Sequence, residues 1–229
     1  MTESLARAII VDLLSQKDPV KGAMVARYMK TSKLEFHGVL VSHIRRTARE
    51  HIKGVPLEQL PALVERLWQE PVFEPRMAGV EILEKYSKEG SIEETIAIVS
   101  RLLDLVDTWS LVDPLCIVSI GNLMIRSKRI EDMIADWRTS DNVWRRRAAI
   151  LPYVQLAKKK YYKKEYANRI FRGVSYHLSD SEFFVAKAVG WALRELSKRE
   201  PESVRTFIDK NRYKMVKLAI REGSKKLKR

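Results

Sequence analysis

Apolar residues recur at every third or fourth position along most of the chain, which is the spacing of an amphipathic helix. Examples lie at Leu5, Ile9 and Leu13, at Leu60, Val64 and Leu67, at Ile92, Ile96, Val99 and Leu103, and at Ala188, Trp191 and Ala192. The alternation of apolar and polar residues that marks a strand is sustained nowhere in the sequence. The pattern therefore predicts an all-helical protein.

Helix-start signals divide the chain into roughly a dozen short helices. Each signal is a capping residue or a first-turn proline, and they occur at Asp18-Pro19, at Ser91 with Glu94, at Ser140-Asp141, from Ser179 to Ser181, and at Glu200-Pro201. We expect connections at Gly54, at Gly90 and across Lys158 to Lys164, none of them long enough to be a flexible linker. The sequence therefore predicts one domain over residues 1–229.

Helix pairs that recur at intervals of about 35 to 45 residues resemble a degenerate HEAT-type solenoid, in which each pair buries its face against its neighbours. Such a solenoid is curved and has a concave surface. An irregular helical bundle would give the same periodicities and remains the alternative.

The charge balance is strongly positive, with 43 Lys and Arg against 29 Asp and Glu, a net charge of +14 and an isoelectric point of about 9.8. The apolar content of 45% excludes collagen-like and wholly disordered proteins. A basic protein of this kind favours a polyanionic partner, of which nucleic acid is the commonest. A single cysteine, Cys116, and four scattered histidines provide neither a disulfide nor a zinc finger, which indicates a reducing, cytoplasmic compartment and no metal site.

No membrane span is expected from the sequence. The richest apolar stretch, from Leu111 to Ile125, is interrupted by Asp113, Pro114 and Asn122. The amino terminus carries acidic residues and helical spacing, which is unlike a signal peptide.

Positive charge is concentrated between Val143 and Arg172, where ten basic residues face a single acid, Glu165. The basic residues are Arg145, Arg146, Arg147, Lys158, Lys159, Lys160, Lys163, Lys164, Arg169 and Arg172, and Tyr153, Tyr161, Tyr162 and Tyr166 lie among them. Basic and hydroxyl side chains together suit phosphate contacts. A second basic run at residues 225–229 is expected to be a disordered or solvated tail.

The segment Asp107 to Pro114 carries the residues most suggestive of chemistry. Trp109 and Asp113 are four residues apart, so on a helix their side chains share one face. A carboxylate beside an aromatic ring stabilises a cation through its charge and the ring quadrupole. The alternative is that Asp113 only caps a helix whose first residue is Pro114.

Three segments, Ala26 to Lys30, Ser140 to Leu151 and Phe183 to Glu195, resemble the AlkD family of DNA alkylation-repair glycosylases. The likeness runs over nearly the whole chain. It implies HEAT-like repeats whose concave face holds double-stranded DNA, and hydrolysis of the N-glycosidic bond of cationic N3- and N7-alkylated purines such as 3-methyladenine and 7-methylguanine. No cofactor is implied, and a monomer is expected.

The resemblance also assigns roles to individual residues. It places the catalytic aspartate at Asp113, the active-site tryptophans at Trp109 and Trp191, a DNA-backbone contact at Arg147 and a cleft-lining tyrosine at Tyr28. As further DNA-binding candidates we take Arg145, Arg146, Lys158, Lys159 and Lys187. Trp68, Trp137 and Trp144 are expected to be packing residues.

The chain departs from the family pattern at two places. Ser110 stands where the family commonly has an acid, and the segment Gly38 to Ile44 differs from the family's Gly-Ile-x-x-Pro-x-Arg, with Arg45 one place late. A non-catalytic nucleic-acid-binding protein of the same fold is one alternative function. A protein-interaction scaffold, the common role of HEAT-type solenoids, is the other.

Overall fold

The computed structural model describes residues 2–227, and it is helical throughout apart from turns and loops. The chain divides into two compact units, residues 1–115 and 116–229. Within the described part of the chain, extended pairing is limited to an isolated parallel bridge between Glu35 and Val72. The predicted all-helical fold of helical repeats is confirmed. The curved groove and the single domain over residues 1–229 stay predictions.

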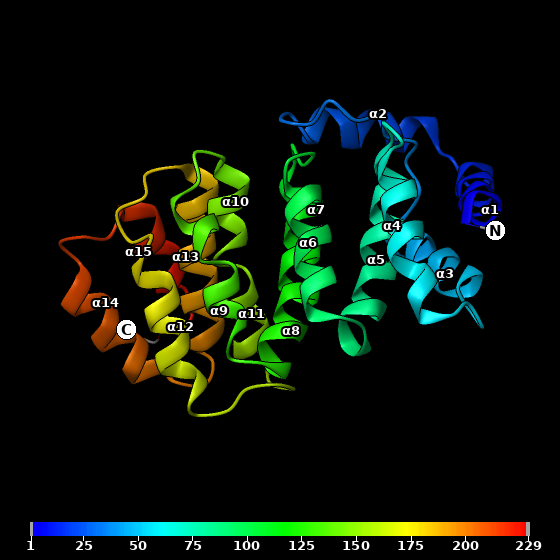
Figure 1. The fold of residues 1–229 in the computed structure, drawn as a ribbon. Coiled ribbons are helices and arrows are strands. Elements are labelled where there is room, and N and C mark those ends of the chain that lie inside the picture. Colours follow the sequence, from blue (N-terminus) through cyan, green and yellow to red (C-terminus); the bar gives the residue numbers. More distant parts are fainter. Residues whose placement is uncertain (1, 228–229) are drawn as a thin grey trace. The chain divides into compact units, whose positions relative to one another are not determined.

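The first unit contains the helices α1 to α7 (Figure 1). Their bounds are α1 Thr2–Ser15, α2 Pro19–Tyr28, α3 Val41–His51, α4 Leu60–Trp68, α5 Phe73–Glu89, α6 Ile92–Leu103 and α7 Trp109–Pro114. The core of this unit forms where α4 packs on α5 and α5 packs on α3, and it contains Leu63, Leu67, Ile82 and Leu83.

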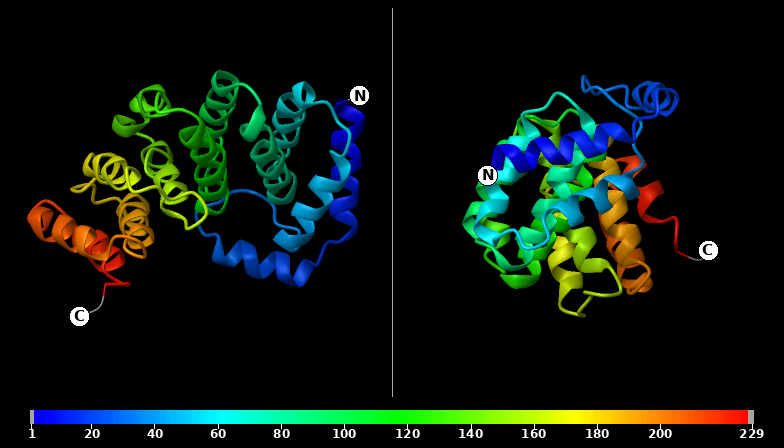
Figure 2. Two further views of the ribbon diagram at one scale, coloured as in Figure 1. Left: turned by 90° about the horizontal axis from the view of Figure 1, so that it is seen from below. Right: turned by 90° about the vertical axis from the view of Figure 1, so that its right-hand side faces the viewer.

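Helix α2 differs from the other helices of the first unit. It runs crosswise to α5 and α7 (Figure 1), and the views of Figure 2 show it lying to one side of the other helices of this unit. Gly22 is its only buried residue, while Val20, Met24 and Tyr28 are exposed. Since burial of an apolar face supplies most of the stability of a short helix, α2 depends on contacts at its ends.

The second unit contains α8 to α15. Their bounds are α8 Gly121–Arg126, α9 Ile130–Met133, α10 Val143–Ala148, α11 Pro152–Ala157, α12 Tyr166–Ser175, α13 Phe183–Leu196, α14 Pro201–Asn211 and α15 Lys217–Gly223. Its central helix, α13, packs against α10, α11, α12 and α15. Arg194 of α13 and Glu222 of α15 add an ion pair of 2.7 Å to this packing.

Several predicted helix starts are confirmed. Asp18 caps α2 by accepting a hydrogen bond from the Lys21 N–H, and Ser91 caps α6 by accepting one from the Glu94 N–H. Helix α14 begins at Pro201, as expected. The predicted start at Ser140-Asp141 is wrong by one residue, since Asn142 caps α10 by accepting a hydrogen bond from the Trp144 N–H.

The expected packing residues lie in the interior. Trp68, Trp137 and Trp144 are buried, and so is Cys116. His177, to which we assign no chemistry, is also buried, and this burial lowers its pKa below 6.5. In the predicted tail, Lys225 pairs with Glu222 at 2.8 Å, which lowers the pKa of Glu222. Lys228 and Arg229 lie outside the described residues.

Among residues 2–227, one helical stretch, Trp109–Arg126, is long and apolar enough to cross a membrane by length and composition. Of this stretch 67% is buried inside the protein, as in the core helix of a globular fold. The same residues include no group of three His, Cys, Asp or Glu side chains placed to hold a metal ion.

Candidate active site and DNA-contacting residues

Helix α7 places Trp109 and Asp113 one turn apart on the same helix. Thr108 caps this helix by accepting a hydrogen bond from the Ser110 N–H at 3.3 Å, so the first helical residue is Trp109. Asp113 is therefore an interior residue of α7. The alternative in which Asp113 only caps a helix beginning at Pro114 is wrong, because Pro114 is the last residue of α7.

The helix changes its geometry directly after Asp113. Pro114 has no N–H to donate, and the six residues Leu115–Ile120 that follow adopt π-helical hydrogen bonding before α8 begins. Such π-helical insertions occur often at functional sites. Asp113 is 7% exposed, so little water surrounds it. Electrostatic interactions between its carboxylate and a nearby positive charge are therefore stronger than they would be in bulk water.

Tyr28 and Trp109 lie together in the first unit. The edge of one ring meets the face of the other, with centroids 6.0 Å apart and planes at 88°. This T-shaped arrangement is favoured by the ring quadrupoles. Tyr28 is 69% exposed and Trp109 is half-buried, so the pair presents aromatic surface to solvent at the start of the helix that carries Asp113.

The segment before Trp109 is joined to the loop that follows Tyr28. The Asp107 carboxylate accepts a hydrogen bond from the Ser32 hydroxyl at 2.8 Å and another from the Lys33 N–H at 2.6 Å. The Thr108 hydroxyl lies 3.5 Å from the Met29 sulfur, inside the protein. These contacts join residues far apart in the chain, so the local sequence pattern does not predict them, although Thr108 is of the residue type that caps helices.

In the second unit, α13 carries Trp191 and Lys187. These residues are four apart, so they share one face of the helix, and Phe183 continues this face by one more turn. Trp191 is half-buried, whereas Lys187 and Phe183 are exposed. The Lys187 ammonium lies 5.1 Å from the centre of the Phe183 ring.

The three consecutive arginines of α10 have different surroundings. Arg147 is 4% exposed; its guanidinium donates to the Phe184 carbonyl and lies 5.9 Å from the Phe184 ring centre. Arg146 is half-buried and pairs with Asp180 at 2.8 Å. Arg145 is half-buried. Internal contacts hold Arg146 and Arg147. The role of all three arginines in DNA binding stays a prediction.

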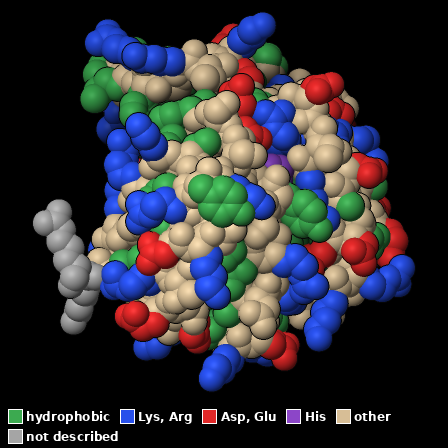
Figure 3. Space-filling model, turned by 90° about the vertical axis from the view of Figure 1, so that its left-hand side faces the viewer, with side chains coloured by type: hydrophobic (Ala, Val, Ile, Leu, Met, Phe, Trp, Pro, Cys, Tyr) green, Lys and Arg blue, Asp and Glu red, His purple; other side chains and the backbone are tan. Residues whose placement is uncertain are grey.

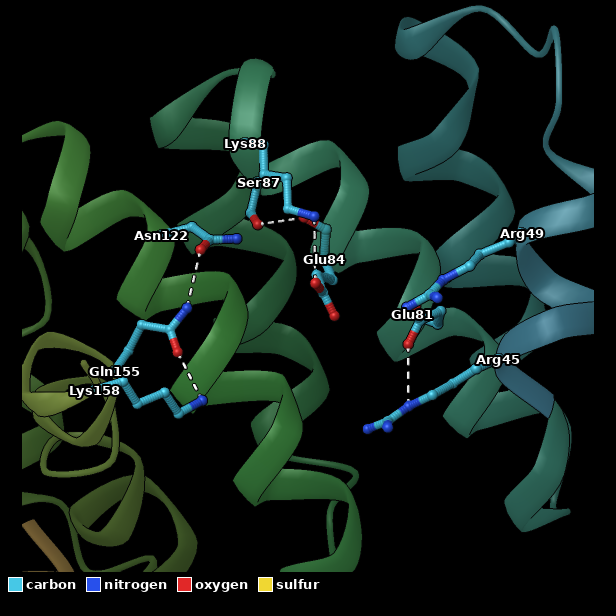
Figure 4. Close-up of polar contacts among 9 residues, drawn as sticks. All are labelled: Arg45, Arg49, Glu81, Glu84, Ser87, Lys88, Asn122, Gln155 and Lys158. Carbon is cyan, nitrogen blue, oxygen red and sulfur yellow. Dashed lines mark hydrogen bonds and ion pairs between the residues drawn. The ribbon is translucent and has the colours of Figure 1, made fainter. Parts of the chain in front are cut away.

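Lys158 and Lys159 begin the connection between α11 and α12, as expected for a loop. Lys159 is exposed, and Lys158 donates to the Gln155 side chain at 2.8 Å. Gln155 in turn donates to Asn122 at 3.2 Å (Figure 4). On the face of the second unit that carries α14, Lys and Arg side chains are spread among apolar and acidic ones (Figure 3).

Arg45, which stands one place late relative to the family pattern, is engaged within the first unit. Arg45 and Arg49 of α3 both reach Glu81 of α5, Arg45 at 3.3 Å (Figure 4). Glu81 is 7% exposed, so these arginines balance a carboxylate that is almost fully buried.

The protein-family model described as DNA alkylation repair enzyme matches residues 9–227 of the chain. The chain belongs to this family. The resemblance found in the sequence is thereby confirmed, and membership of the DNA alkylation repair enzyme family gives the protein a role in repairing alkylation damage, with DNA as its substrate.

Solved structures agree with the assignment to the DNA alkylation repair enzyme family. A predicted DNA alkylation repair enzyme from Enterococcus faecalis is 25% identical and superimposes with a TM-score of 0.78, covering 93% of this chain and 97% of that one. AlkD2 from Streptococcus mutans is 22% identical with a TM-score of 0.65, covering 91% and 100%. The curated proteins compared with the chain include no match.

Proposed function

We propose that this member of the DNA alkylation repair enzyme family is a monofunctional DNA glycosylase. It hydrolyses the N-glycosidic bond of cationic N3- and N7-alkylated purines in duplex DNA, inside the cell and as a monomer. The observation that carries the proposal is the buried Asp113 carboxylate, one helical turn from Trp109 with its edge-on partner Tyr28.

The chemistry follows from the charge of the lesion. An alkylated purine that is already positive needs no protonation before it departs, so the enzyme must stabilise the positive sugar and position a water. A bond forms between the water oxygen and C1′ while the bond from C1′ to the purine nitrogen breaks. The bonding electrons go to the purine and neutralise its charge, and Asp113 accepts the proton that the water loses.

The aromatic residues serve the same transition state. The face of the Trp109 ring attracts the developing positive charge on the sugar, and Tyr28 holds that ring at a fixed angle. Trp191 is expected to provide a second aromatic surface against the lesion; this role rests on the resemblance to the AlkD family.

The charge requirement gives a direct test. Matched duplexes would contain either 7-methylguanine or uracil, and release of the free base would be followed by chromatography. We expect release of 7-methylguanine alone, because only that base carries a positive charge for Asp113 and Trp109 to act on. Equal release of both bases would contradict the mechanism, and salt-sensitive binding without any release would favour the non-catalytic DNA-binding alternative.

DNA affinity should depend steeply on salt because basic side chains displace counterions from phosphates. We expect Lys159→Ala to weaken binding and to lower the slope of log affinity against log salt by about 1. Lys210→Ala, at an exposed position of α14 outside the predicted set, is the matched control and should leave the slope unchanged. Fluorescence anisotropy at several salt concentrations measures both variants. Equal slopes for wild type and Lys159→Ala would remove Lys159 from the DNA-binding residues.

A further inference from the structure

Helix α2 carries Tyr28 at its last residue, and little packing holds this helix in place. Its only buried residue is Gly22, and a hollow of about 290 Å³ lies beside it, lined among others by Met24, Val39 and Ser110. The position of Tyr28 over Trp109 must therefore come from contacts at the two ends of α2 rather than from an apolar interface along it.

The first end is held by Glu74 of α5. One oxygen of this carboxylate, which is 1% exposed, accepts hydrogen bonds from the N–H groups of His37 and Gly38 at 2.9 Å each and of Val39 at 3.3 Å. The His37 carbonyl in turn accepts a hydrogen bond from the Asp18 N–H at 2.8 Å, directly before α2. These hydrogen bonds fix the position of the residue before α2. They do not involve the far end of α2, which carries Tyr28.

The far end is held by Asp107. Its two carboxylate oxygens accept hydrogen bonds from the Ser32 hydroxyl at 2.8 Å and the Lys33 N–H at 2.6 Å, and hydrogen bonds to a charged acceptor are stronger than neutral ones. The guanidinium of Arg76 adds positive charge nearby, and it donates to the Leu105 carbonyl in the same loop at 3.1 Å. Asp107 thereby joins the loop after Tyr28 to the residues directly before Trp109.

We infer that Asp107 is a positioning residue for the proposed base release: it sets the contact between Tyr28 and Trp109. Asp107 binds Ser32 and Lys33, the next residue, Thr108, contacts Met29, and the one after it, Trp109, contacts Tyr28. The residues that lead into α7 are therefore held one by one against the segment that ends α2 and follows it. The activity part of this inference rests on the proposed function, whereas the positioning of Trp109 does not.

The test is fluorine NMR of the protein labelled with 5-fluorotryptophan, in which Trp109→Phe assigns the Trp109 resonance. Asp107→Ala removes both hydrogen bonds, and we expect its Trp109 resonance to shift and broaden while the buried Trp137 and Trp144 keep theirs. Asp107→Asn retains an acceptor for the Lys33 N–H and should restore most of the wild-type signal. Ser32→Ala removes one of the two hydrogen bonds and should give a smaller change in the same direction.

Lys33→Ala is the matched control, because the backbone N–H that Asp107 binds is unaffected by the loss of the exposed side chain. It should leave the Trp109 resonance unchanged. With methylated duplex as substrate, Asp107→Ala should lower the single-turnover rate about ten-fold or more, as small displacements of catalytic groups do, without weakening DNA binding.

An unchanged Trp109 resonance in folded Asp107→Ala would overturn the inference whatever the activity. If Asp107→Ala does not fold, the same criterion applies to Ser32→Ala. A different outcome is that the wild type releases no base while Asp107→Ala still shifts the Trp109 resonance. That outcome would contradict the proposed function and leave the positioning role of Asp107 in place.

Discussion

Asp113→Asn should lower the single-turnover rate of base release about 1000-fold, which corresponds to about 4 kcal/mol of lost transition-state stabilisation. The substitution preserves the size of the side chain and removes its charge. Without that charge, α7 offers the positive sugar only the ring of Trp109, and the nucleophilic water loses its proton acceptor. The rate would be measured with excess enzyme on duplex DNA that contains 7-methylguanine.

The control for this variant is Asp104→Asn, which makes the same change at an exposed carboxylate of the first unit. It should release base at the wild-type rate. Both variants should bind DNA at least as tightly as the wild type, since each removes a negative charge. If Asp113→Asn releases base at a rate within a few-fold of the control, another group must supply the negative charge that stabilises the positive sugar.

Gly38→Ala should lower the free energy of unfolding by about 3 kcal/mol, from backbone strain and overpacking together. Gly38 has φ of 78°, a conformation that disfavours side chains, and an added Cβ would lie 2.3 Å from the Asp18 carbonyl oxygen and 2.5 Å from the Gly22 nitrogen. Those backbone atoms form the start of α2, so they cannot yield without moving that helix. Urea unfolding would measure the loss.

Gly54→Ala separates the strain from the clash. Gly54 has nearly the same φ, 74°, yet an added Cβ there would meet nothing within 4 Å. This control should lose only about 1 kcal/mol, the cost of the left-handed conformation. Equal losses in the two variants would show that the start of α2 adapts freely and that its position is not fixed by the segment around Gly38.

The helices could be predicted from local patterns because their signals lie within a few residues of each other. The Ser91 and Glu94 pair and the first-turn Pro201 mark the starts of α6 and α14 as expected. Between Ser140 and Asn142, three consecutive residues are all of capping type, and only the structure shows that Asn142 accepts the hydrogen bond. The arrangement of the helices depends on contacts between distant residues, which the sequence pattern does not specify.

The candidate site could be predicted only in part for the same reason. Four-residue spacing predicts Trp109 and Asp113 on one helix, whereas Tyr28 is a candidate cleft-lining residue only through the family resemblance. Its contact with Trp109 is seen only in the structure. The hydrogen bond between Ser32 and Asp107 joins residues 75 positions apart, and each is an ordinary polar residue in its local context. The burial of Arg147 could likewise not be predicted from the sequence, because three consecutive arginines give no indication of which one faces the interior.

The departures from the family pattern can now be placed in the fold. Ser110 lies in the first turn of α7 and lines the hollow beside α2, where an acid would add negative charge among mostly apolar side chains. Arg45 pairs with Glu81 inside the first unit. Both positions lie in the same unit as Asp113, and neither substitution replaces Trp109 or Asp113 themselves.

The measurement that tests the proposed function most directly is the release of free bases from methylated duplex DNA by the wild-type protein, separated by chromatography, with the DNA strand examined for breaks. The proposal predicts release of 3-methyladenine and 7-methylguanine, with intact strands that break only on later treatment with alkali. Salt-sensitive DNA binding without release of either base would contradict it and identify the protein as a non-catalytic DNA-binding member of its family.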